Sequence, residues 1–144
     1  MAEVRARLTA GERFAGPVAA AFYDAVHTLD PTATEDSVAT LKGNSGVHLY
    51  ESLIAWAAPV AGERILDLGC GSGGAGRAAG RIVGESGMVV GVDSCRRSLD
   101  VARARAPEDV PMAFIHASAE RMHEVPDKSF DCVVASMVLE EIQN

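Results

Sequence analysis

The chain has 144 residues, of which 48% are hydrophobic, and its formal net charge is −7. This length suits one globular domain with a real core and is short for two domains. The negative charge, with no basic stripe, argues against a broad nucleic-acid footprint, which needs clustered lysine and arginine. The apolar runs are far shorter than a membrane span, so no membrane association is expected.

Cysteine use is sparse. The sequence contains Cys70, Cys95 and Cys132, and no two of them form a CxxC motif. An odd, scattered set predicts neither a disulfide framework nor a zinc site, so no metal is expected. The N-terminal residues also lack the apolar core of a secretory leader. These features together favour a protein of the reducing cytoplasm.

Residues 1–60 are predicted to form a helical segment that acts as a cap or lid. Apolar side chains recur at helical spacing over 14–29 and again over 47–58. Prolines and glycines follow both stretches and would end the helices. Trp56 of the second helix is expected in the core.

Residues 61–144 alternate between strand and helix patterns. Strands are predicted at 64–68, 88–93, 112–116 and 130–135, and helices at 75–83 and 96–106. Ser94 or Ser98 is the expected cap of the second helix. Such alternation predicts an α/β fold with parallel strands joined by right-handed crossovers.

A glycine-rich turn follows the first strand. Gly69, Gly71 and Gly73 lack a Cβ, so the chain can adopt positive φ there and a ligand can lie against bare backbone. The helix that follows also offers the unpaired amides of its N-terminus. A strand, a glycine turn and a helix in this order predict a nucleotide-type cradle.

Two acidic residues accompany this turn. Asp93 ends the second strand, 24 positions after Gly69, where a carboxylate can accept hydrogen bonds from both hydroxyls of a ribose. Gly69, Gly71 and Gly74 also satisfy the dinucleotide fingerprint GxGxxG. Asp67, however, would repel a pyrophosphate and favour a cationic group, such as that of a sulfonium-bearing nucleoside.

These motifs resemble the first half of a class I S-adenosylmethionine-dependent methyltransferase. The signature D-x-G-x-G-x-G is present at 67–73, and the strand VVGVD at 89–93 is similar to the second family motif. The segments AE at 119–120 and PDKSFDCVV at 126–134 are similar to a third. The three motifs occur in the family order.

The resemblance implies a role for each motif residue toward S-adenosylmethionine. Asp93 would hold the ribose, and Ala135 would close the pocket near the methyl group. The methionine end would be lined by Asp67, Gly69, Cys70, Gly71 and Gly73, and the adenine would be flanked by Ser94, Ser118 and Ala119. Ser118 stands where the family often has Asp, so its contact with adenine would carry no charge.

The histidines of the sequence offer one weak candidate for a catalytic residue. His48 precedes the motif and could act as a general base, although a place at the border of the substrate mouth is the more ordinary interpretation. The other histidines, His27, His116 and His123, are expected at the surface or in packing.

The family topology implies the strand order 3-2-1-4, in a Rossmann-like sheet that is truncated relative to the seven-stranded family fold. The fourth strand would then be an edge, and one apolar face would lack cover. A homo-oligomer, a second completing chain or a fold-back of the N-terminal helices could supply this cover. The chain could equally be a truncated part of a longer enzyme.

Three functions remain open at this stage. The leading one is an S-adenosylmethionine-dependent methyltransferase, or its cofactor-binding half, acting on a small molecule. The second is a non-catalytic remnant that binds S-adenosylmethionine or a partner protein. The third and weaker one is a nicotinamide dinucleotide-binding domain, which Gly74 motivates.

Overall fold

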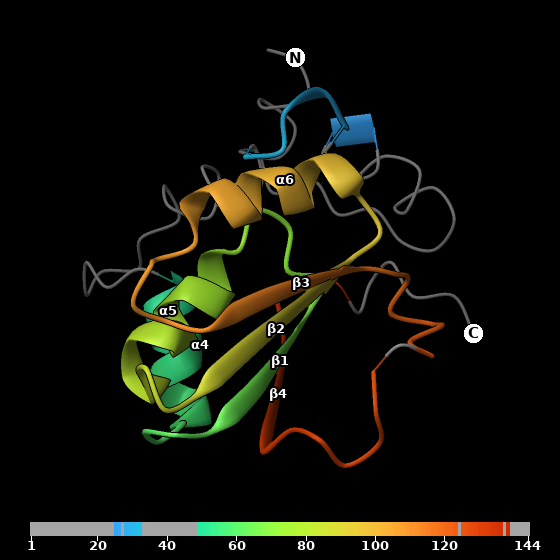
Figure 1. Ribbon diagram of the computed structural model, residues 1–144. Coiled ribbons are helices and arrows are strands. Elements are labelled where there is room, and N and C mark those ends of the chain that lie inside the picture. Colours follow the sequence, from blue (N-terminus) through green and yellow to red (C-terminus); the bar gives the residue numbers. More distant parts are fainter. Residues whose placement is uncertain (1–24, 27, 33–48, 124, 137, 139–144) are drawn as a thin grey trace.

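The computed structural model describes residues 25–26, 28–32, 49–123, 125–136 and 138. Its elements are α4 (Leu49–Ala57), β1 (Arg64–Leu68), α5 (Gly74–Val83), β2 (Met88–Asp93), α6 (Arg96–Arg105), β3 (Met112–His116) and β4 (Cys132–Ala135). The strands form one parallel sheet in the order β3-β2-β1-β4 (Figure 1). The predicted α/β class and strand order are confirmed.

The fourth strand starts later than predicted. It begins at Cys132, whereas the apolar pattern suggested residue 130. The amide of Asp131 instead donates to the carbonyl of Arg64 at 2.9 Å, and its carboxylate accepts from the Arg64 amide at 2.8 Å. The Arg64 guanidinium lies 5.7 Å from the ring centroid of Phe130. These two residues therefore fasten the start of β1 and do not extend β4.

The predicted cap of α6 is wrong. Cys95 occupies the N-cap position and makes no side-chain cap. Ser98 is fully buried, and its Oγ has no hydrogen-bond partner among the described residues. The turn into the helix is held instead by Asp93, whose Oδ1 accepts from the Cys95 amide at 2.7 Å. This contact is local, because the two residues lie only two positions apart.

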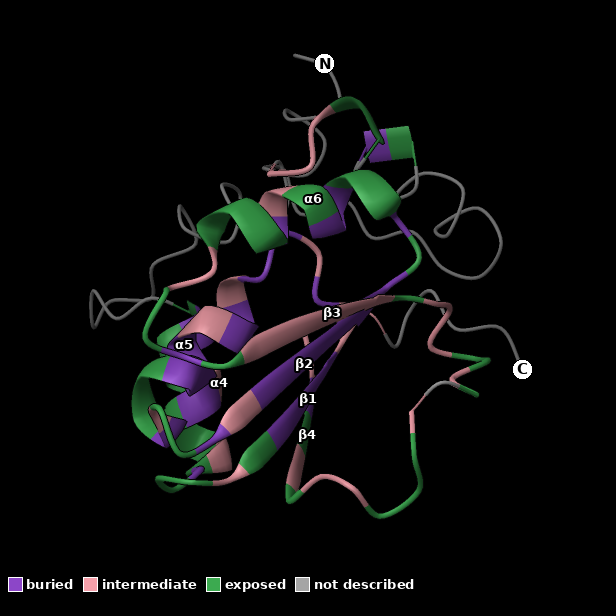
Figure 2. Cartoon of the chain, viewed as in Figure 1, coloured by how far each residue is buried: buried purple, intermediate pink, exposed green. Residues whose placement is uncertain are grey.

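Helices α4 and α5 cover one face of the sheet. The buried cluster there joins strand residues to both helices and contains Tyr50, Ile54, Ile65, Ala75, Ala78, Ala79, Val83, Val89 and Val134. Figure 2 shows this buried layer between the helices and the central strands. Trp56 is 87% exposed, so its predicted core position is wrong. Tyr50 and Ile54, four residues apart, form the inward face of α4, and Trp56 lies off that face.

The opposite face has thinner cover. Its buried side chains are Leu66, Val90 and Val92, and the connection between β3 and β4 packs over them. That connection runs along the side of the sheet away from α4 and α5 (Figure 1). Val133 of β4 remains 55% exposed. Among the described residues the fourth strand is thus an edge with a partly bare apolar face, as expected.

Much of the N-terminal segment lies outside the described residues. Residues 25–26 and 28–29 are helical, in line with the end of the helix predicted over 14–29. His48, the candidate base, is not described. Within the described ranges, no helix is long and apolar enough to cross a bilayer. The same ranges hold no group of three His, Cys, Asp or Glu side chains placed to share a metal ion.

Candidate functional site

The carboxyl ends of β1 and β2 meet at one edge of the sheet, where α/β folds bind ligands. The register pairs Asp67 with Gly91 and Leu68 with Val92. The glycine loop, residues 69–73, crosses between the two strands, because the Cys70 amide donates to the Val92 carbonyl at 3.0 Å. The loop therefore lies directly over the ends of both central strands.

The middle of the glycine loop is bare. Gly71 has φ +52°, and no atom lies within 4 Å of the position that a Cβ would take. At Gly69 and Gly73 the corresponding positions face Val138 and Ala102. Gly71 is therefore the point at which a ligand can approach the main chain most closely.

The Asp93 carboxylate joins the glycine loop to the turn after β2. Its Oδ2 accepts from the Gly71 amide at 2.8 Å, and its Oδ1 accepts from the Cys95 amide at 2.7 Å. Asp93 is 7% exposed. Each carboxylate oxygen keeps a further lone pair, so the pair of oxygens is already oriented and can still accept from a diol.

Asp67 has a contrasting environment. It is 1% exposed and faces the first turn of α5, where a Cβ on Gly76 would lie 3.1 Å from its Oδ2. That Oδ2 has no hydrogen-bond partner among the described residues. Burial raises the pKa of Asp67 to about 7, with a further rise from Asp93 and a partly offsetting effect of the Gly76 amide. Two neighbouring carboxylates thus make the site favourable to a positive charge.

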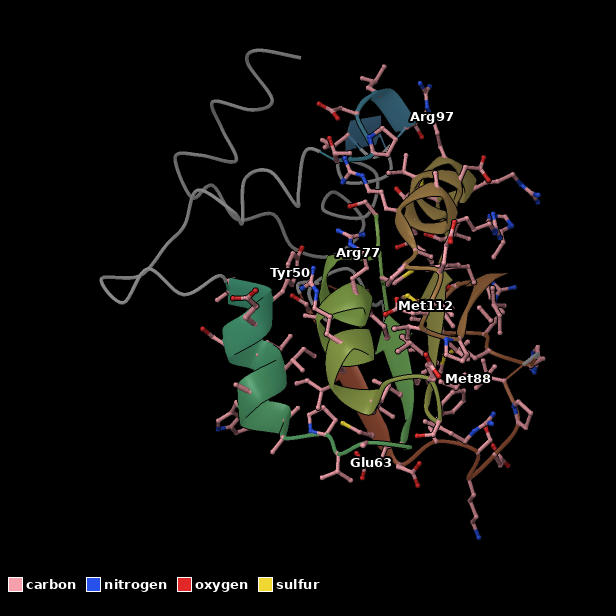
Figure 3. All side chains as sticks on the ribbon, turned by 60° about the vertical axis from the view of Figure 1, so that its left-hand side comes forward. Tyr50, Glu63, Arg77, Met88, Arg97 and Met112 are labelled. Atoms are coloured by element: carbon pink, nitrogen blue, oxygen red, sulfur yellow. The ribbon has the colours of Figure 1, made fainter. Side chains whose placement is uncertain are left out.

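Helix α4 closes one side of the loop through Tyr50. A Cβ on Gly74 would lie 2.5 Å from Cε2 of the Tyr50 ring, so only glycine fits at the start of α5. Figure 3 shows Tyr50 and Arg77 at the same end of the two helices. Nη1 of Arg77 donates to the Ser72 carbonyl at 2.7 Å, and this hydrogen bond holds the loop to α5. The packing of Tyr50 therefore explains why the third position of the GxGxxG pattern, Gly74, is a glycine, and no bound pyrophosphate is needed to explain it.

Cys70 is a packing residue of the loop. It is 8% exposed, and its Sγ would lie 2.7 Å from a Cβ on Gly91. Burial, followed by the charges of Asp67 and Asp93, raises the pKa of the Cys70 thiol far above its ordinary value. The thiol therefore stays protonated at neutral pH and is a poor nucleophile.

The residues expected around adenine lie on adjacent loops. Asp93 pairs with His116 in the sheet, and the Ala117 amide donates to the Asp93 carbonyl at 3.1 Å. Ser94 is exposed, whereas Ser118 and Ala119 are half-buried. The Ser118 hydroxyl accepts from the Glu120 amide at 3.2 Å and forms a local turn. The fold brings these three residues to the side of Asp93.

Ala135 lies on the other side of the loop. It is the last residue of β4, is half-buried and pairs with Leu68 at the end of β1. The predicted site residues that the structure describes therefore gather at one edge of the sheet, on both sides of Gly71. His48 cannot be placed among them.

His116 makes contacts that were not predicted from the sequence. Its Nε2 lies 2.9 Å from the Ser94 carbonyl, and its Nδ1 lies 3.3 Å from Nη2 of Arg96. The histidine is exposed, as expected, but it contacts the turn that carries Asp93. The usable signal was its position at the end of the third strand, opposite the acid that ends the second.

A cavity of about 650 Å³ lies beside α5, and Arg77, which contacts the Ser72 carbonyl of the glycine loop, is one of its lining residues. It is bounded by the last turn of α5, by Arg105 at the end of α6 and by Val110 before β3. Helix C-termini present carbonyl groups, which the flanking arginines of these two helices complement. The cavity therefore has no chemistry that singles out a ligand.

The chain is similar to known methyltransferases. The family model described as "Methyltransferase domain" matches residues 65–144. A demethylmenaquinone methyltransferase of Clavibacter sepedonicus is 35% identical over 88% of this chain and 48% of its own length. A ubiquinone biosynthesis O-methyltransferase of a Ruegeria strain is 31% identical over 81% of this chain and 44% of its own.

A solved structure supports the same relationship. The S-adenosylmethionine-dependent methyltransferase from Mesorhizobium loti is 33% identical, with a TM-score of 0.54, over 67% of this chain and 42% of that protein. The chain thus spans about half the length of the curated relatives it matches. The residues that the family model matches contain the glycine loop, both acidic residues and the four described strands apart from Arg64, the first residue of β1.

Proposed function

This chain belongs to the methyltransferase domain family, and we propose that it binds S-adenosylmethionine across the glycine loop. One observation supports this most directly. The open backbone of Gly71 lies between two carboxylates, one pre-oriented by amides and the other buried with an unpartnered oxygen. A cationic nucleoside complements that arrangement, whereas a pyrophosphate would be repelled.

The parts of S-adenosylmethionine match different parts of the site. Its ribose diol suits the remaining lone pairs of Asp93. Its carboxylate suits the N-terminus of α5, which begins at Gly74. Its sulfonium and ammonium groups suit the negative field of Asp67 and Asp93.

Asp67 acts from beneath the loop. Because it is 1% exposed and faces Gly76, its contribution to binding is electrostatic and does not require direct contact. A cation above the loop favours the charged carboxylate and offsets part of the penalty of its burial. We therefore assign Asp67 to charge complementarity and Asp93 to hydrogen bonding.

The remaining motif residues border the two ends of the cofactor. Ser94, Ser118 and Ala119 flank the adenine, and Ser118 offers a neutral hydroxyl there. Ala135 lies near the methyl group, beside the end of β1. Gly69, Cys70 and Gly73 shape the loop that supports the methionyl part.

The reaction is transfer of a methyl group to a small molecule. S-adenosylmethionine supplies an electrophilic methyl group when bound. The chain itself contributes by holding donor and acceptor in line and by excluding water, which are the main means of lowering such a barrier. A base is needed only if the acceptor must lose a proton, and His48 is the candidate for it.

The acceptor is proposed to be a quinone-type ring. Two curated relatives carry names from menaquinone and ubiquinone biosynthesis. The described residues around Gly71 form the cofactor side of the site. Residues 1–60 could provide a lid over that side, with 61–144 as the cofactor-binding unit.

We also propose that further polypeptide completes the sheet at β4. Val133 is 55% exposed on an edge strand, and exposed apolar edges favour association. A second copy of this chain or a second chain could pair there. Light scattering at micromolar concentration should then show a dimer or larger species, whereas a monodisperse monomer would contradict pairing between copies.

The three free cysteines are in keeping with a cytoplasmic setting.

Calorimetric titration tests the cofactor assignment. S-adenosylmethionine should bind with one site per chain, and NAD should give no signal under the same conditions. Tight NAD binding without S-adenosylmethionine binding would overturn the proposal in favour of a dinucleotide domain. Binding without transfer to any demethylated quinone would instead identify a non-catalytic cofactor-binding protein.

A further inference from the structure

We propose that His116 is a positioning residue that sets the turn after β2 for cofactor binding, through its contact with the Ser94 carbonyl. The inference rests on the proposed function, because it concerns the same site. It extends that function to a residue outside the three motifs. His116 touches neither the ribose position nor the glycine loop in any described contact, so it acts through Ser94 and Asp93.

The contacts of His116 define which nitrogen carries the proton. A guanidinium can only donate hydrogen bonds, so Nδ1 must accept from Nη2 of Arg96, at 3.3 Å. Nε2 then carries the proton and donates to the Ser94 carbonyl at 2.9 Å. Arg96 thereby selects the tautomer in which the ring can hold Ser94.

The turn that is held in this way carries the ribose acid. Ser94 lies between Asp93 and Cys95, and the Cys95 amide donates to the Asp93 carboxylate at 2.7 Å. A rotation of the Ser94 peptide would change the direction of that amide. The direction of the Asp93 carboxylate, which also meets the Gly71 amide, would change with it. His116 therefore links the end of β3 to the orientation of both Asp93 oxygens.

A second side-chain contact between α6 and β3 provides a matched control. Nη2 of Arg103 donates to the Phe114 carbonyl at 3.3 Å, two residues before His116, and both Arg103 and His116 are exposed. This contact also joins the helix to the edge strand, but it does not touch the turn at 93–95. A purely structural role of such contacts would make the Arg103 and His116 variants behave alike.

The experiment compares four variants by calorimetric titration with S-adenosylmethionine. His116→Gln keeps an amide NH₂ near the Nε2 position, whereas His116→Asn places its amide near Nδ1 and cannot reach Ser94. We expect His116→Ala and His116→Asn to bind about fivefold more weakly, as the loss of one exposed hydrogen bond predicts. We expect His116→Gln to stay within about twofold of the wild type, and Arg103→Ala likewise.

A second measurement separates this inference from the proposed function. Amide hydrogen exchange at Cys95 in the ligand-free protein should become faster in His116→Ala and stay unchanged in Arg103→Ala. Wild-type-like affinity and exchange in His116→Ala would overturn the role of His116, even if the wild type binds the cofactor. Failure of the wild type to bind would overturn the proposed function, while the exchange result would still decide whether His116 orders the turn.

Discussion

The carboxyl ends of β1 and β2 each carry an aspartate, and the two aspartates have opposite hydrogen-bonding environments. Asp93 has both carboxylate oxygens satisfied by backbone amides at 2.7 and 2.8 Å. Asp67 is equally enclosed, yet its Oδ2 has no partner in the described part of the chain. Both acids are buried next to the same loop, so hydrogen bonding distinguishes them, and burial remains the main reason that the pKa of Asp67 is raised.

This difference suits the two acids to different roles in one site: Asp93 orients the ligand, and Asp67 complements its positive charge. A carboxylate whose oxygens are already held is suited to a geometric task, because its direction does not change when a ligand arrives. A buried carboxylate with an unpartnered oxygen is costly to ionise, and a nearby cation lowers that cost. The comparison predicts that Asp93 supports both the fold and the ligand geometry, whereas Asp67 opposes stability at neutral pH and favours a cationic ligand.

The pH dependence of stability gives the largest expected effect. The folded-state pKa of Asp67 is about 7, against 3.8 for the ordinary carboxyl group. Because the folded-state pKa is raised, the contribution to stability is fully present below pH 3.8 and is lost as pH rises to 7. A shift of this size corresponds to roughly 4 kcal/mol.

Denaturant unfolding between pH 4 and pH 8 measures this effect. Asp67→Asn should remove most of the loss, so the variant gains on the wild type as the pH rises. Asp100→Asn, which changes an exposed acid on α6, is the control and should follow the wild type. Parallel pH profiles for Asp67→Asn and the wild type would show that the two acids do not differ as described.

Removal of the Asp93 side chain should produce the next largest effect. Asp93→Ala leaves the Gly71 and Cys95 amides without their acceptor, and charge-assisted bonds contribute about 1.5–3 kcal/mol each. We expect a stability loss of about 3 kcal/mol and loss of measurable cofactor binding. Asp127→Ala, at an exposed turn, should change neither chemical denaturation nor calorimetric titration. Unchanged stability in Asp93→Ala would contradict the geometric task assigned to this acid.

The wall beside the loop can be tested through Gly74. Gly74→Ala places a methyl group 2.5 Å from the Tyr50 ring, which should cost about 2 kcal/mol through overpacking. The double variant with Tyr50→Ala should then lose less stability than the sum of the losses in the two single variants, because the effects of substitutions at contacting residues are not additive. Additive losses in thermal or chemical unfolding would show that Tyr50 does not limit this position.

Substitution of Gly71 should give the smallest change in stability. It tests whether the ligand lies over the loop between the two acids. Its φ of +52° makes an L-residue strained by about 1 kcal/mol, but a methyl group meets no atom within 4 Å. Gly71→Ala should therefore fold nearly normally and yet bind S-adenosylmethionine about tenfold more weakly, since the methyl occupies the approach to the loop. Wild-type affinity in calorimetry would place the ligand elsewhere.

Much of this fold could be predicted because the signals are local. The bounds of β1, β2 and β3 follow from short apolar runs between turn residues, and the strand order follows from the family resemblance. The errors concern tertiary context. Trp56 fits an apolar stripe, yet the face of α4 that packs on α5 is defined by Tyr50 and Ile54. Serine is a common N-cap residue, yet Ser98 is buried within α6.

Residue type and spacing along the chain are enough to place one acid before a glycine turn and a second acid at the end of the next strand. The three-dimensional structure decided that the Gly71 amide, 22 residues from Asp93, also holds this carboxylate, and that Asp67 keeps an unpartnered oxygen. It also decided that His116 reaches the Ser94 carbonyl. These outcomes depend on which groups the sheet register and the helix packing bring within hydrogen-bond distance, and spacing along the chain does not encode that distance.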